Sequence, residues 1–199
     1  LSSVLENVSI PVVAAGGFRD GSGLAASLAW GASGIAMGTR FMMTQESPVP
    51  DKTKEAYISA GVEDIKVTKK FDGLPHRLIF NDYIQKIDRS NPFSLFVMSV
   101  TSAWKYKQIT KASYSDLIKS FFAMLKGDDL TISQSIMSAN SPAIIQRAMV
   151  EGSPTEGAMP SGQVAGIITN LPSCNELITK IMRDFNVAAT NFKKIEGDR

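Results

Sequence analysis

The chain has 199 residues, of which 44% are hydrophobic and 20% charged, as in ordinary globular proteins. Its 21 basic and 19 acidic residues leave a formal net charge of +2, which argues against nucleic acid or a membrane surface as a partner. The single cysteine, Cys174, excludes an internal disulfide and a cysteine-cluster metal site. We therefore predict a cytoplasmic protein with no metal.

The first residues suggest that the chain is part of a larger protein. It starts at Leu1 without methionine and runs almost at once into an apolar stretch typical of a buried strand. A buried parallel strand needs pairing partners on both sides. We expect this sequence to be the C-terminal part of a longer chain.

A β-α-β unit is predicted at the start. The run Ile10–Ala15 is continuously apolar, as in a strand covered on both faces of a parallel sheet. Asp20 can cap a following helix that stops at Gly31. A second strand is expected over Ser33–Met37, so the two strands would be parallel and joined by a right-handed crossover.

The rest of the chain is predicted to be mostly helical. A short helix is expected from Asp51 to Ala60, and a strand is indicated around Ile65. From about Ser90 onward, helix starts are indicated at Ser113, at the Ser141-Pro142 pair, and at a capping box formed by Ser173 and Glu176. This region reads as a helical subdomain appended to the α/β unit.

Each predicted strand of the β-α-β unit ends in a glycine turn: Gly16-Gly17 after the first and Gly38-Thr39 after the second. In (β/α)8 barrels, the loops after the last two strands commonly form a phosphate site. Bare backbone amides can approach an anion closely there, while Thr39 could add a hydroxyl and Arg40 a charge. Spacing alone leaves a purely structural role for these glycines open.

Two blocks of the sequence resemble one known family. The stretch IPVVAAGGFRDGSGLAASLAWGASGIAMGTRFMMTQES closely resembles the C-terminal barrel segment of the nitronate monooxygenase (2-nitropropane dioxygenase-like) family, which includes related FMN-dependent enoyl reductases. The stretch EGSPTEGAMPSGQVAGIITNLPSCNELITKIM is similar to the family's downstream segment, and FDGLPHRLIFNDYI matches it more loosely.

This resemblance implies an α/β fold: the last two strands of an FMN-binding (β/α)8 TIM barrel with a helical lid. The predicted parts are barrel residues 1–47, a connecting segment 48–89, and a helical subdomain 90–199 that returns to the flavin. The implied FMN contacts are Gly16, Gly17, Gly38 and Thr39 at the phosphate, with Ser161, Gly162 and Gln163 on the same flavin face. The resemblance places the active-site histidine upstream of this chain.

The resemblance implies an oxidoreductase with a small-molecule substrate and, as a further possibility, a homodimer. Nitronate oxidation is the leading activity, with NAD(P)H-dependent enoyl reduction and a non-catalytic phosphate-binding barrel as alternatives. His76 and Cys174 are read as structural residues, because neither has a catalytic partner in the sequence pattern. The aromatic and basic run Trp104–Lys111 reads as a solvated helix end.

Overall fold

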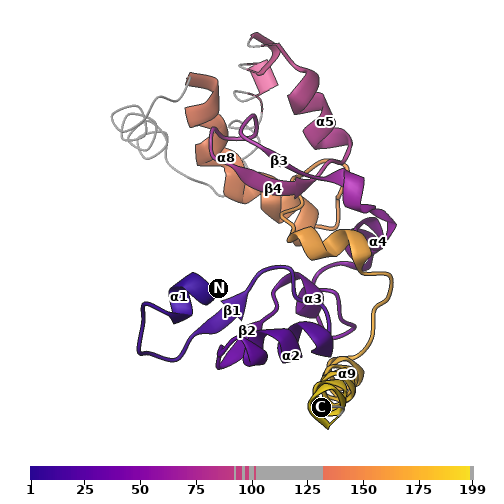
Figure 1. Ribbon diagram of the computed structural model, residues 1–199. Helices are drawn as coiled ribbons and strands as arrows, with labels where there is room; N and C mark the ends of the chain where they lie inside the picture. Colours follow the sequence, from indigo (N-terminus) through magenta and orange to yellow (C-terminus); the bar gives the residue numbers. More distant parts are fainter. Residues whose placement is uncertain (92, 96, 99–100, 102–131, 198–199) are drawn as a thin grey trace. The chain divides into compact units, whose positions relative to one another are not determined.

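The computed structural model describes residues 1–91, 93–95, 97–98, 101 and 132–197 (Figure 1). The chain divides into two compact units. The first unit comprises Leu1–Pro48 and Gly162–Arg199, and the second comprises Val49–Ser161. The residues from Gly162 onward group with Leu1–Pro48, and Val49–Ser161 form the other unit, while the division into three predicted parts stays a prediction.

The first unit contains the β-α-β arrangement expected from the sequence. Its elements are α1 (Ser2–Leu5), β1 (Val13–Ala15), α2 (Gly21–Ala29), β2 (Gly34–Ala36), α3 (Thr39–Met42), the 3-10 helix η2 (Gln163–Ile167) and α9 (Cys174–Gly197). The two strands are parallel, with Val13 opposite Gly34 and Ala15 opposite Ala36. The α/β class is therefore confirmed, while the place of these strands in a barrel stays a prediction.

The first strand is shorter than predicted, and part of its apolar surface is exposed. It begins at Val13 instead of Ile10, whose side chain is 70% exposed, and Val13 is 57% exposed. Pro11 has no N–H to donate to a strand ladder, so regular pairing starts only after it. Within the described residues β2 is the one strand paired with β1, so a strand covered on both faces stays a prediction for the longer protein.

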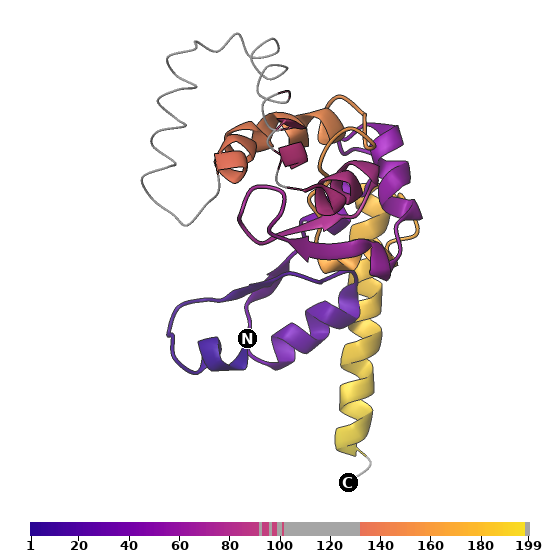
Figure 2. The same cartoon turned by 90° about the horizontal axis from the view of Figure 1, so that it is seen from above.

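The crossover helix α2 is fixed at its start by a side-chain cap and by close packing. Asp20 accepts hydrogen bonds from the backbone N–H groups of Ser22 (3.2 Å) and Gly23 (3.4 Å), which confirms the predicted cap. The N-terminal end of α2 lies against α9 (Figure 2). Gly21 is placed so closely that an added Cβ would come within 1.9 Å of the Ile181 carbonyl oxygen.

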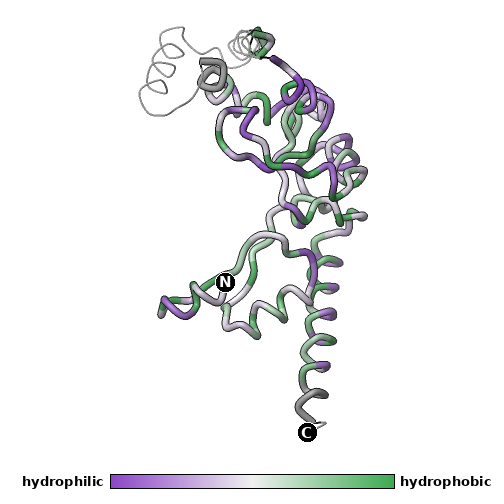
Figure 3. The backbone as a smooth tube through the Cα atoms, turned by 45° about the horizontal axis from the view of Figure 1, so that its top comes forward, coloured by the Kyte–Doolittle hydropathy of each residue, from purple (hydrophilic) through white to green (hydrophobic). Residues whose placement is uncertain are grey.

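The helix α9 begins at the predicted capping box. The Ser173 N–H donates to Glu176 Oε2 (2.8 Å), and the Glu176 N–H donates to Ser173 Oγ (3.2 Å). Hydrophobic and hydrophilic residues alternate along this helix (Figure 3), and its buried residues include Leu177 and Ile181. The amphipathic stripe therefore gives α9 an inner face for the first unit.

The second unit is built around a two-stranded antiparallel sheet. Its elements are α4 (Asp51–Ser59), the 3-10 helix η1 (Val62–Asp64), β3 (Ile65–Thr68), β4 (His76–Ile79), α5 (Asp82–Arg89) and α8 (Ile132–Met149). The predicted helix from Asp51 and strand at Ile65 are confirmed, whereas β4 was missed. The core of this unit consists of Phe71, Leu78, Ile84, Ile87, Met137, Ile144 and Ala158.

One helix start was predicted wrongly. The pair Ser141-Pro142 was expected to open a helix, but Pro142 lies inside α8. Proline lacks the N–H that would bond the carbonyl of Ser138, four residues earlier. The Ser141 hydroxyl donates to that carbonyl instead (2.9 Å), so the helix continues through the proline with this acceptor satisfied. The predicted helix from Ser113 and the run Trp104–Lys111 lie outside the described residues.

No helix in the described part of the chain combines the length and apolar character that a membrane crossing requires.

Candidate functional site

The two glycine turns lie at the same edge of the parallel sheet. Because Ala15 is opposite Ala36, the residues that follow each strand leave the sheet side by side. Gly16 and Gly17 both adopt left-handed backbone conformations, with φ of 93° and 78°. Few residues other than glycine adopt such angles, so this turn requires the two glycines.

The backbone at these turns is open to a ligand. A Cβ added at Gly16, Gly17 or Gly38 would meet no other atom within 4 Å. Among the described residues, no group accepts a hydrogen bond from the N–H of Gly17, Gly38 or Thr39. We call the backbone of Gly16, Gly17, Gly38 and Thr39 the glycine cradle. Free N–H groups beside empty space are what a phosphate group needs for close binding.

The return segment, residues 162–173, docks on α3 beside the glycine cradle. The Gly162 N–H donates to Thr39 Oγ1 (3.0 Å), and a Cβ at Gly162 would lie 2.9 Å from that oxygen. Gly162 is therefore required for this close approach. The Thr39 hydroxyl keeps its own proton, which it can still donate to an anion.

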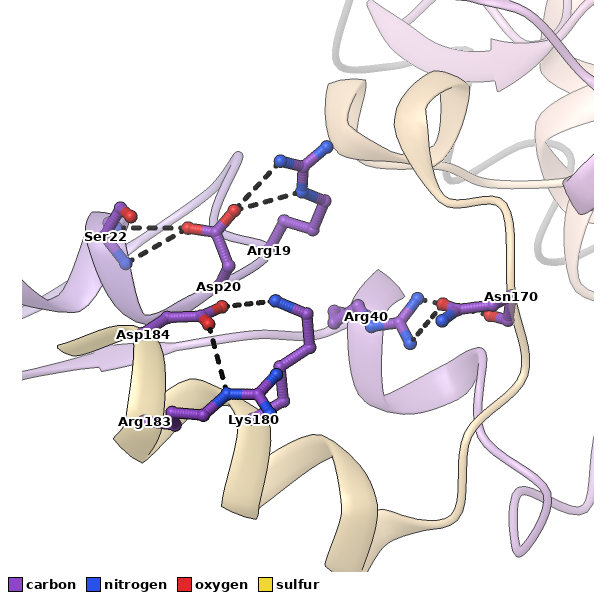
Figure 4. Close-up of polar contacts among 9 residues, drawn as sticks. Arg19, Asp20, Ser22, Arg40, Asn170, Lys180, Arg183 and Asp184 are labelled. Carbon is purple, nitrogen blue, oxygen red and sulfur yellow. Dashed lines mark hydrogen bonds and ion pairs between the residues drawn. The ribbon is translucent and has the colours of Figure 1, made fainter. Parts of the chain in front are cut away.

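Further contacts tie the return segment to the residues of and after α3. Arg40 Nη1 donates to the Asn170 carbonyl oxygen (3.3 Å), and Arg40 Nη2 donates to Asn170 Oδ1 (3.0 Å; Figure 4). The Gln45 N–H donates to the Pro172 carbonyl (3.1 Å). Arg40 thus turns toward Asn170, and the sequence-based idea that it adds charge to the glycine turns finds no support in its contacts.

The seven predicted cofactor contacts are divided between the two units. Gly16, Gly17, Gly38, Thr39, Gly162 and Gln163 belong to the first unit, and Gln163 begins η2 with an exposed side chain. Ser161 is the last residue of the second unit, where its N–H donates to the Arg77 carbonyl (3.1 Å). Gly162 and Thr39, two of the seven predicted cofactor contacts, are in direct contact through a hydrogen bond.

Beside α3 lies a pocket that sequence reasoning missed. Its volume is about 560 Å³. It is lined by the cations Arg19, Arg40 and Lys180, the acids Asp20 and Glu176, and Gln45, Ile167, Ile168, Thr169, Asn170, Leu171, Pro172, Leu177 and Ile181. We call it the cationic pocket. Its three cations come from segments far apart in the sequence, so no short sequence motif predicts the pocket.

Burial and charge shape the ionisable groups of this pocket. Arg40 is only 3% exposed, and burial lowers the pKa of its guanidinium, with the Arg19 charge lowering it further. Arginine nevertheless stays protonated. Burial opposes the charge of Asp20, but hydrogen bonds from Arg19, Gly23 and Ser22 outweigh it and lower the pKa of Asp20. Both groups are therefore charged near neutral pH.

His76 and Cys174, predicted from the sequence to have structural roles, both have close polar partners in the structure, and their structural roles stay predictions. His76 Nε2 lies 2.8 Å from Oδ2 of the buried Asp72, and its ring meets Phe71 edge-on in the second unit. Cys174 Sγ lies 3.6 Å from Thr44 Oγ1, and the Cys174 N–H bonds the Glu46 carboxylate. Within the described residues, no three histidine, cysteine or carboxylate side chains form a group that could hold a metal ion.

The chain matches known proteins along most of its length. A family model described as nitronate monooxygenase matches residues 1–184. A (3aS,4S,5R,7aS)-5-hydroxy-7a-methyl-1-oxo-octahydro-1H-indene-4-carboxyl-CoA dehydrogenase of Rhodococcus jostii is 47% identical over 184 residues, which are 92% of this chain and 52% of the relative. The Mycobacterium tuberculosis protein of the same name is 42% identical over 187 residues, with 92% and 53% covered.

Other matches are shorter or more distant. A probable nitronate monooxygenase of Staphylococcus aureus is 41% identical over 86 residues, 43% of this chain and 24% of the relative. The solved structure of FabK from Thermotoga maritima has a TM-score of 0.65 at 26% identity, covering 100% of this chain and 50% of that one. Nitroalkane oxidase from Streptomyces ansochromogenes has a TM-score of 0.60 at 25% identity, with 96% and 44% covered. The chain thus spans about half the length of the relatives it matches over most of its own length.

Proposed function

Because the chain belongs to the nitronate monooxygenase family, we propose that it supplies the phosphate-binding side of an FMN-dependent oxidoreductase. One observation carries this proposal. In the described part of the chain, the N–H groups of Gly17, Gly38 and Thr39 have no hydrogen-bond acceptor, and open space lies beside both glycines at neighbouring ends of two parallel strands. An anion is the ligand that such a backbone arrangement binds best.

The residues present fit the phosphate of FMN. The amides of Gly17, Gly38 and Thr39 would donate to its oxygens, Gly16 would leave room for the phosphate to approach, and the Thr39 hydroxyl would add a further hydrogen bond. Bound FMN would supply a two-electron carrier between a small-molecule substrate and an acceptor. Ser161, Gly162 and Gln163 are proposed to face the same cofactor, and Gly162 also holds the Thr39 oxygen in place.

For the substrate, we propose a carboxyl-CoA compound that is oxidised. The two relatives named carboxyl-CoA dehydrogenases match 92% of the chain, whereas the Staphylococcus aureus relative matches 43%. The similarity to the dehydrogenases therefore extends well beyond the length of the glycine turns and includes residues of both units. Dehydrogenation of a CoA compound is the activity that this pattern of similarity supports best.

Nitronate oxidation is the second candidate. The description of the matching family model and the name of the Staphylococcus aureus relative both favour it. The glycine cradle serves both chemistries, because it would bind the cofactor and not the substrate. A homodimer and a cytoplasmic location stay predictions.

The test is to purify the intact protein, extract its cofactor, and follow its visible absorbance without oxygen. We expect FMN, and we expect a carboxyl-CoA of a fused-ring acid to bleach the flavin bands. Bleaching by an alkyl nitronate and not by the CoA compound would favour the second candidate. A colourless protein that takes up no FMN would show a non-catalytic barrel and overturn the proposed function.

A further inference from the structure

The cationic pocket has no role in the cofactor assignment. None of the glycine-cradle residues lines it, although Arg40 directly follows Thr39 on α3. We propose that this pocket binds the nucleoside-phosphate end of the CoA substrate. The inference rests on the proposed function, because it assumes that the substrate carries CoA.

The buried guanidinium of Arg40 is the first reason. Arg40 is almost fully removed from solvent, yet its hydrogen bonds within the described residues go to the two oxygens of Asn170, which are uncharged. No carboxylate in the described part of the chain forms an ion pair with it. A buried charge without a counter-charge is costly, so an anionic ligand entering the pocket would be strongly favoured.

The second reason is that two further cations can turn toward the same ligand. The side chains of Arg19 and Lys180 are 46% and 53% exposed, and they form ion pairs with Asp20 and Asp184 (Figure 4). Exposed ion pairs contribute little stability. Arg19 or Lys180 can therefore leave its carboxylate partner and bind a ligand phosphate at a small free-energy cost. Arginine and lysine both form strong charge-assisted hydrogen bonds with phosphate oxygens.

The acidic residues that line the pocket are held in place by other groups. Asp20 Oδ1 accepts hydrogen bonds from the N–H groups of Ser22 and Gly23 at the start of α2, and these bonds persist when Arg19 turns toward a ligand. Glu176 accepts hydrogen bonds from the N–H and the hydroxyl of Ser173 in the capping box. These contacts hold both carboxylates in place, and among the described residues Arg40 is left without an ion-pair partner.

The walls of the pocket are suited to a nucleoside as well as a phosphate. Ile168, Leu177 and Ile181 are buried apolar residues of the lining, and Thr169 and Asn170 add polar groups. A volume of about 560 Å³ lies in the range of ligand pockets, which are mostly apolar with a few placed polar groups. An apolar wall for a base and cations for phosphate oxygens match the nucleotide half of CoA better than a lone inorganic anion.

The experiment measures CoA binding by titration calorimetry on the FMN-loaded intact protein at low salt. Arg19→Gln and Lys180→Gln remove exposed cations of the pocket, so neither is expected to unfold the protein. Arg183→Gln is the matched control, because Arg183 lies on the same helix and approaches Asp184 (4.0 Å) but does not line the pocket. We expect each pocket variant to weaken CoA binding about tenfold and the control to leave it unchanged. Pantetheine, which lacks the nucleotide, should bind all four proteins equally.

The outcomes separate this inference from the proposed function. If CoA binds the two pocket variants as tightly as the wild type, the pocket assignment is wrong while a CoA substrate stands. If the pocket variants lose NADPH affinity but keep CoA affinity, the pocket holds a dinucleotide and the inference is also wrong. If the wild type binds no CoA at all, both the proposed CoA substrate and this assignment of the pocket are wrong.

Discussion

Gly162 and Thr39 are 123 positions apart in the sequence, yet the N–H of the first donates to the hydroxyl oxygen of the second at 3.0 Å. This bond fastens the return segment to the one-turn helix that follows β2. It also fixes the orientation of the Thr39 hydroxyl beside the glycine cradle. The proposed cofactor site would therefore combine residues from early and late parts of the chain.

The Thr39 hydroxyl should contribute both to the contact with Gly162 and to the proposed binding of the FMN phosphate. In Thr39→Val, the Gly162 N–H loses its acceptor and the proposed phosphate loses a donor. We expect FMN affinity to fall at least about tenfold, since a hydrogen bond to a charged group is worth about 1.5–3 kcal/mol. Thr39→Ser keeps the hydroxyl and should bind FMN nearly as the wild type does. Flavin fluorescence titration measures both variants, and equal affinity for all three proteins would exclude the role of Thr39.

The contact of α2 with α9 should be intolerant of a single methyl group. Gly21→Ala would bring Cβ to 1.9 Å from the Ile181 oxygen and 2.4 Å from the Phe185 nitrogen, both backbone atoms. Overpacking of this kind typically costs about 1–3 kcal/mol. Urea unfolding should show that loss for Gly21→Ala and not for Ser22→Ala, whose side chain is exposed. Equal stability of the two variants would mean that the helices pack less closely.

Asp20 should make stability depend on acid pH. Its folded pKa is lowered, because hydrogen bonds to the carboxylate outweigh its burial. The stabilisation is therefore fully present above the unfolded pKa of about 4 and is lost as the pH falls through the lower folded value. Asp20→Ala should lose about 1 kcal/mol at neutral pH. The difference from wild type should shrink below about pH 4, as urea unfolding at several pH values would reveal; a constant difference would contradict it.

His76 should be dispensable for turnover. Its contacts are with Asp72 and Phe71 in the second unit, which describes a structural role. We expect His76→Ala in the intact protein to keep most of its kcat while losing some stability. Loss of a general base would instead lower the rate by roughly 10²–10⁴-fold. Steady-state kinetics beside thermal unfolding distinguish the two roles.

Local features were predictable from the sequence because they depend on neighbouring residues. The Asp20 cap, the capping box of Ser173 and Glu176, and the parallel β-α-β unit follow from short patterns, and the structure confirms them. The same local reasoning failed at Pro142, where the Ser141 hydroxyl replaces the missing N–H and lets the helix continue.

Contacts between distant residues could not be predicted in this way. The attachment of Arg40 to Asn170 and the packing of Gly21 on Ile181 depend on how the return segment and α9 come back to the start of the chain. The cationic pocket arises from the same return. No spacing within a single element indicates these contacts.

The central claim is that the glycine cradle holds the FMN phosphate, and Gly38→Val tests it most directly. Gly38 has φ −80° and open space where a Cβ would lie, so the protein fold itself tolerates a side chain there. Gly34→Val is the matched control, because Gly34 in β2 is equally open but outside the cradle. We predict that both apoproteins melt like the wild type, while Gly38→Val alone binds FMN at least about tenfold more weakly, since the side chain displaces the phosphate from its amides. Unchanged FMN affinity in a folded Gly38→Val protein would contradict the account.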